Sequence, residues 1–149
     1  MQNLRVILLM VLGVGCSTTT GPQSGDEFQL RVGESAALED VGLWLAFLGV
    51  SEDSRCPRQL ACLWEGDAAV LVETAPFPGG LAILAETAGF PDFLGADSKT
   101  DTLHTSLDPK SLRLGPRELV LVGLDPYPET PSPIPLHAYV ARFIIRPAQ

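Results

Sequence analysis

The sequence is poor in positive charge and in histidine. It contains 10 lysine and arginine residues against 18 aspartate and glutamate residues, with 2 histidines and a formal net charge of −8. Nucleic-acid binding needs a basic face that neutralises phosphates, so this composition argues against that class of function. The same acidity disfavours docking on anionic lipid head groups.

Long apolar runs and helical periodicity are also missing. The longest apolar run extends from Val6 to Val14, whereas a transmembrane helix needs about 20 such residues. No segment longer than a turn or two repeats its apolar residues every 3.6 positions, and no internal repeat is visible. These absences exclude a helical bundle, a repeat protein and a spanning helix as interpretations of the sequence.

Catalytic signatures are missing as well. A hydrolase needs a nucleophile, a base and an orienting group brought together. Serines and aspartates are plentiful, but no nucleophile-elbow motif is present, and His104 and His137 stand far apart in the sequence. We therefore expect no catalytic residues, no cofactor and no enzyme activity, with both histidines as ordinary surface or edge residues.

The first 15 residues have the features of an export signal. A head carrying Arg5 precedes the apolar run, small residues follow at positions 13–15, and Cys16 comes next. A charged head, a short apolar core and small residues are typical of a secretory signal peptide. The segment resembles the lipobox of bacterial lipoproteins, in which the cysteine is acylated and becomes the new N-terminus. An ordinary signal peptide followed by an unrelated cysteine is the alternative.

The resemblance to a lipobox has one departure and two implications. Gly13 occupies the place that usually holds leucine, and Leu12 lies one position further back. In such lipoproteins an aspartate after the cysteine marks retention at the inner membrane, so Ser17 implies an anchor in the outer membrane. The domain would then face the periplasm or the cell surface. Several acyl chains on Cys16 would anchor the protein strongly.

The predicted organisation has three parts: residues 1–15 are the signal peptide, 16–27 a small, polar and flexible tether, and 28–149 a single β-domain. Cleavage before Cys16 leaves 149 − 15 = 134 residues, and loss of Arg5 changes the formal charge from −8 to −9. A chain of this length is long enough to bury a hydrophobic core.

Short segments of alternating polarity predict an all-β fold, an antiparallel β-sandwich or barrel-like domain of about seven to eight strands. The candidate strands are residues 28–32, 36–38, 43–50, 67–74, 81–87 (with a short helix as the alternative), 98–107 (an edge strand), 112–114 (a brief extended piece), 117–124 and 137–146. We expect a loop at 89–95 to cap the core and the proline-rich residues 125–135 to form a stiff surface loop.

The alternation also predicts which side chains share the core. In the third candidate strand we expect four apolar residues to point inward and Trp44 to face the other way. In the last strand we expect four residues to share one face. The two sets are Leu43, Leu45, Phe47 and Val50, and Tyr139, Ala141, Phe143 and Ile145.

Once Cys16 is assigned to the lipid, Cys56 and Cys62 remain as a pair. In an exported protein such a pair predicts a disulfide. Closing so small a ring stabilises the fold by about 2 kcal/mol in the chain-entropy model, so the bond mainly shapes its own loop. The alternative is a thiolate metal site with His104 or His137, but zinc sites usually show two closely spaced ligand pairs.

The sequence around these cysteines resembles a known signature. It reads Asp53-Ser54-Arg55-Cys56-Pro57, four residues, then Cys62-Leu63-Trp64-Glu65-Gly66. This is similar to the D-S-R-C-P-x4-C-x-W-x-G motif of a group of uncharacterised exported bacterial lipoproteins. The match covers about fourteen residues, with Glu65 where many members have alanine. The resemblance implies an exported β-domain but no particular activity.

The candidate partner-binding residues are Asp53, Arg55, Arg58, Trp64 and Glu65. We expect Arg55 to pair with Asp53 or Glu65 or to donate to loop carbonyls, and Trp64 to pack against the disulfide. The predicted function is a non-enzymatic cell-envelope lipoprotein, held at the membrane through Cys16, that presents the loop to an unknown envelope protein or serves a structural role. The alternative is a small-ligand or metal-binding periplasmic protein.

Overall fold

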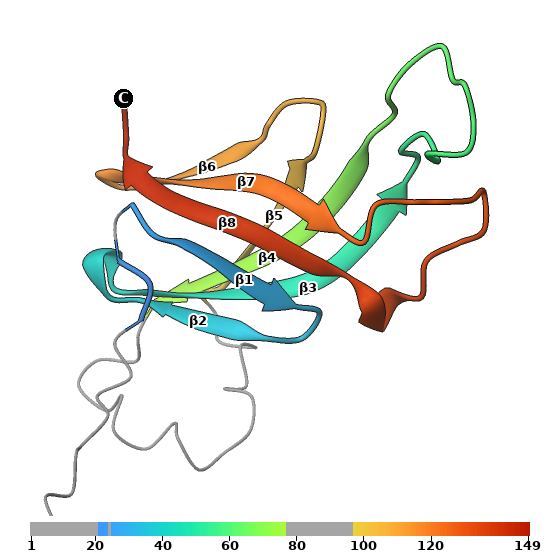
Figure 1. Ribbon diagram of the computed structural model, residues 1–149. Coiled ribbons are helices and arrows are strands. Elements are labelled where there is room, and N and C mark those ends of the chain that lie inside the picture. Colours follow the sequence, from blue (N-terminus) through green and yellow to red (C-terminus); the bar gives the residue numbers. More distant parts are fainter. Residues whose placement is uncertain (1–20, 24, 77–96) are drawn as a thin grey trace, which may run out of the picture.

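The computed structural model describes residues 21–23, 25–76 and 97–149, and within these ranges the chain forms two four-stranded antiparallel sheets. One sheet has the strand order β2-β3-β4-β5 and the other β1-β8-β7-β6, and the two face each other as a β-sandwich (Figure 1). The strands are β1 (Glu27–Arg31), β2 (Ser35–Leu38), β3 (Leu43–Asp53), β4 (Ala68–Pro76), β5 (Lys99–His104), β6 (Ser111–Leu114), β7 (Arg117–Asp125) and β8 (Val140–Pro147). The described residues also form two single-turn 3-10 helices, η1 (Glu39–Val41) and η3 (Leu136–Ala138).

The predicted fold class is confirmed, and most predicted strands coincide with observed ones. β5 is an edge strand, as expected for the threonine-rich segment. The last strand begins at Val140 rather than at 137, because residues 136–138 turn in η3 after Pro135. The predicted strand 81–87 and loop 89–95 lie outside the described residues. In the described ranges, none of the helical segments has the length and apolar character to cross a membrane.

The core lies between the sheets and consists of the inward faces of alternating strands. Its fully buried members include the following large side chains: Leu38, Leu45, Phe47, Val70, Val72, Leu103, Leu119, Phe143 and Ile145. The rings of Phe28 and Phe143 pack at a centroid distance of 5.8 Å. The expected common face of the last strand is confirmed, because Tyr139, Ala141, Phe143 and Ile145 are all at most 5% exposed.

A bulge in β3 explains why Val50 joins the core. Plain alternation from Phe47 would turn a residue three positions later outward. The pairing with β4 shifts register between Phe47 and Gly49, which leaves Leu48 as the extra residue. A bulge of this kind reverses the facing of the residues after it. Leu48 is accordingly 40% exposed, whereas Val50 packs against the core.

Three connections lie at one end of the sandwich. We call residues 54–67, between β3 and β4, the cysteine loop, and residues 126–139, between β7 and β8, the proline segment. The backbone of Arg58 bonds to Pro128 and that of Thr105 to Ala68, so the β5–β6 connection shares this end. β1 begins at the opposite end, since Glu27 pairs with Ile144 near the end of β8 (Figure 1).

Candidate functional site

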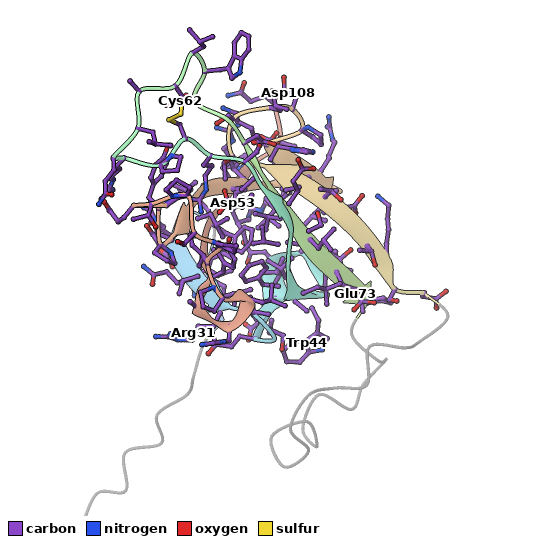
Figure 2. The ribbon with its side chains drawn as sticks, turned by 90° about the vertical axis from the view of Figure 1, so that its right-hand side faces the viewer. Arg31, Trp44, Asp53, Cys62, Glu73 and Asp108 are labelled. Carbon is purple, nitrogen blue, oxygen red and sulfur yellow. A yellow bond between two sulfur atoms is a disulfide. The ribbon has the colours of Figure 1, made fainter. Side chains whose placement is uncertain are left out.

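Cys56 and Cys62 form the predicted disulfide, with their Cα atoms 6.0 Å apart. The cross-link closes the outer part of the cysteine loop, which projects from the end of the sandwich (Figure 2). Both sulfurs are consumed by this bond, so the oxidised protein offers neither of them as a thiolate ligand.

The base of the cysteine loop extends the β3–β4 ladder. Ser54 donates its backbone N–H to Asp67 O at 2.7 Å, and Cys56 donates to Glu65 O at 2.7 Å. Gly66 closes this base with a φ of +72°, and a Cβ at this position would overlap the carbonyl oxygen of Ser54. Only glycine fits here, because the backbone is left-handed and the backbone of Ser54 and Arg55 passes directly against it.

Arg55 is a buried structural cation. Its side chain is 4% exposed, and its Nε and Nη2 donate to the two carboxylate oxygens of Asp53 at 2.8 and 2.7 Å. The same guanidinium donates to Leu124 O at 2.6 Å and to Pro126 O at 3.0 Å. Arg55 therefore ties the start of the cysteine loop to the end of β7 in the other sheet.

Asp53 completes this buried network. Its Oδ2 accepts a hydrogen bond of 2.9 Å from the Tyr139 hydroxyl, and its Oδ1 accepts the backbone N–H of Arg55 at 3.2 Å. Burial opposes ionisation, but the hydrogen bonds from Arg55 and Tyr139 outweigh it and lower the pKa of Asp53. Burial and the neighbouring Asp53 carboxylate raise the pKa of Tyr139 to about 12. The network thus stabilises an ionised aspartate beneath the loop.

The structure narrows the set of candidate partner-binding residues. The side chains of Asp53 and Arg55 are only 11% and 4% exposed and are occupied by each other, so they hold the loop in place rather than present a surface. The expected pairing of Arg55 with Asp53 is confirmed. The carbonyl oxygens that Arg55 reaches belong to Leu124 and Pro126 and not to its own loop. Arg58, Trp64 and Glu65 are on the surface of the loop.

Arg58 attaches the cysteine loop to the proline segment. Its backbone N–H donates to Pro128 O at 3.0 Å, and its Nη1 pairs with Glu129 Oε1 at 2.7 Å. The guanidiniums of Arg55 and Arg58 lie 5.1 and 5.3 Å from the centre of the Tyr127 ring. Such cation–π contacts and paired backbone groups fix the relative position of the two segments.

The expectation that Trp64 packs against the disulfide was wrong. Trp64 is 79% exposed and its neighbour Leu63 is 92% exposed. Among the described residues, the hydrogen bonds of the loop lie at its base, on its Arg58 side and between positions 56 and 60, and the side chains of Leu63 and Trp64 remain exposed. The bond between the cysteines shapes this turn without burying its side chains.

Asp67 ends the cysteine loop and anchors the neighbouring β5–β6 connection. Its carboxylate contacts His104 Nδ1 at 2.5 Å and accepts hydrogen bonds from Thr105 Oγ1 and the backbone N–H groups of Ser106 and Leu107. Burial opposes its ionisation, but these donors prevail and lower the pKa of Asp67 to about 2. His104 is therefore a bonded residue at the end of an edge strand, whereas His137 is exposed in η3.

Sequence reasoning missed the Asp67–His104 contact and the role of Tyr139 in the Asp53 network. The partners lie 37 and 86 positions apart, and nothing in a single sequence links them. Across residues 21–23, 25–76 and 97–149, no group of three or more His, Cys, Asp or Glu side chains is arranged to hold a metal ion.

Comparison with known proteins assigns no relationship. No protein-family model matches the chain, and no curated protein or solved structure does so either. A function must therefore be argued from the geometry of the site itself.

Proposed function

We propose that this protein is an exported, non-enzymatic lipoprotein that presents the cysteine loop to a protein partner in the cell envelope. The observation that carries the proposal is the exposure of Leu63 and Trp64, at 92% and 79%, on a loop whose base is held rigidly. Tryptophan is enriched among the residues that dominate binding energy at interfaces. A pre-organised loop also loses little conformational entropy on binding.

The scaffold below the loop supports this role. The disulfide, the Arg55 network and the Arg58 contacts restrain the loop at three places. None of these contacts needs the side chains of Leu63 or Trp64. In a loop with a purely structural role, an exposed leucine and tryptophan would expose apolar area to water without compensation.

The lipid anchor belongs to the same proposal and rests on Cys16 and the residues before it. Acylated Cys16 would hold the protein in the outer membrane, with the β-sandwich in the periplasm or at the cell surface. Mass spectrometry of the protein purified from its own cells tests this: we expect the mature chain to begin at an acylated Cys16, and Cys16→Ser to release it from the membrane fraction. An unmodified cysteine in the mature protein would contradict the anchor.

Site-specific photo-crosslinking in intact cells tests partner binding. We expect a photoreactive residue in place of Leu63 to capture a discrete protein. The matched control is Leu48, which is 40% exposed in the middle of β3 rather than in the loop. Capture from position 48 but not from position 63 would overturn the proposal.

Small-ligand or metal binding is the alternative, and we place it second because the disulfide occupies both sulfurs. Native mass spectrometry with and without reductant distinguishes the two. A metal retained only after reduction would favour the alternative, since free thiolates would then be available as ligands.

A further inference from the structure

The outer surface of the cysteine loop forms an apolar tip together with the neighbouring β5–β6 connection. We define the apolar tip as Leu60, Leu63, Trp64 and Leu107, which are 50%, 92%, 79% and 59% exposed. Trp64 and Leu107 flank a shallow hollow of about 400 Å³. Side chains from two different connections therefore contribute to one surface, which is the arrangement of an interface core rather than of scattered exposed residues.

The rim of the apolar tip is acidic. Glu65 lines the hollow beside Trp64, and Asp108 directly follows Leu107; both acidic residues are exposed. Figure 2 shows Asp108 at the same end of the molecule as Cys62. Two cations lie nearby. The charge of Arg58 is offset by Glu129, whereas Lys110 has no ion pair within the described residues. The rim of the apolar tip therefore carries two exposed carboxylates and one ammonium group.

We propose that the apolar tip docks into an apolar pocket of a partner protein whose rim carries lysine or arginine side chains. This inference rests on the proposed function and specifies the chemistry of the partner. An apolar centre supplies most of the affinity, whereas complementary charges at the rim increase the association rate and select the partner. A second copy of this chain would bring two acidic rims together, which like-charge repulsion opposes.

The position of the apolar tip also favours a protein over the anchoring membrane. β1, which follows the predicted tether, begins at the opposite end of the sandwich (Figure 1). The tip therefore points away from the place where the chain enters the domain. Its carboxylates would in addition be repelled by anionic lipid head groups.

The test introduces charge reversals into the full-length protein with the photoreactive residue at position 63, in its own cells. We expect Glu65→Lys and Asp108→Lys each to reduce the crosslinked product roughly tenfold, as like charges then face each other. Glu73→Lys is the matched control: it makes the same change in net charge on β4, far from Cys62 (Figure 2), and should leave the yield unchanged. Thermal unfolding of each variant confirms that it is folded.

The decisive support is a charge swap. Mapping the crosslink identifies a lysine or arginine on the captured protein. Changing that residue to glutamate should restore the crosslinked product that is lost in the Glu65→Lys variant. The inference is overturned if both reversals leave the yield unchanged, or if position 63 captures a second copy of the chain. Leu63-dependent co-sedimentation with phosphatidylethanolamine and phosphatidylglycerol vesicles would overturn it too. A crosslinked yield that does not depend on charge would contradict only the inferred chemistry of the partner. Capture from position 48 alone would contradict the proposed function itself.

Discussion

The hydroxyl of Tyr139 donates a 2.9 Å hydrogen bond to the carboxylate of Asp53, 86 positions earlier in the chain. Tyr139 lies just before β8 in one sheet, and Asp53 ends β3 in the other. The bond therefore joins the two layers directly beneath the cysteine loop. Arg55 strengthens the same junction from the loop side, so the loop is built on a polar contact between the sheets.

Arg55→Met should destabilise the protein by about 3 kcal/mol or more. The variant leaves Asp53 as a buried carboxylate without its cation, which is a costly arrangement. Urea unfolding gives the free energy. Arg58→Met is the control. The side chains of Arg58 and Glu129 are 64% and 58% exposed, and such an exposed ion pair contributes at most about 1 kcal/mol to the free energy of unfolding. A loss of about 1 kcal/mol or less in Arg55→Met would show that the buried network does not stabilise the fold.

Gly66→Ala should destabilise more than Gly115→Ala. Both glycines have positive φ, at +72° and +61°, but a Cβ at Gly66 would overlap the backbone of Ser54 whereas one at Gly115 meets nothing within 4 Å. The left-handed backbone costs about 1–2 kcal/mol in either variant, and overlap adds about 1 kcal/mol or more at Gly66. Chemical denaturation measures the loss of stability in each variant. A smaller loss in Gly66→Ala than in Gly115→Ala would contradict the predicted overlap with Ser54.

Asp67 should make the protein sensitive to acid. Its pKa is lowered from 3.8 to about 2 in the folded state. The ionised carboxylate therefore stabilises the fold fully at a pH above the pKa of the unfolded chain, and this stabilisation is lost as the pH falls from about 4 toward 2. We expect this stabilisation to contribute about 1 kcal/mol to the free energy of unfolding, allowing for solvent screening. Urea unfolding at several pH values should show a shallower acid dependence in Asp67→Asn. Asp108→Asn, on the neighbouring loop, is the control; an unchanged slope in Asp67→Asn would refute the assignment.

Removing the disulfide should leave the sandwich folded. Cys56→Ser with Cys62→Ser should cost about 2 kcal/mol, because the ring is short and the core contains neither residue. Circular dichroism should report unchanged strand content, whereas crosslinking from position 63 should fall as the outer turn loses its shape. Undiminished crosslinking would show that the Arg55 and Arg58 contacts suffice to hold the loop.

The strands and the disulfide were predictable because each leaves a local trace. Alternation in residues 43–50 and 117–124 reflects one buried face per strand, and a pair of cysteines behind a predicted export signal predicts a disulfide. The bulge at Leu48 left a weaker trace, since only the spacing of Phe47 and Val50 suggests it. Nothing near Arg55 indicates that its guanidinium reaches the carbonyl groups of Leu124 and Pro126, 69 and 71 positions away.

The sequence by itself determined the all-β fold class and the cross-link between Cys56 and Cys62, because strand periodicity and cysteine pairing depend on neighbouring residues. Only the tertiary structure decided which residues of the charged loop are buried. Arg55 and Trp64 were both candidate partner-binding residues, but Arg55 is held between the sheets and only Trp64 is exposed. Burial depends on where the other sheet and the proline segment lie, and that information is spread over the whole chain.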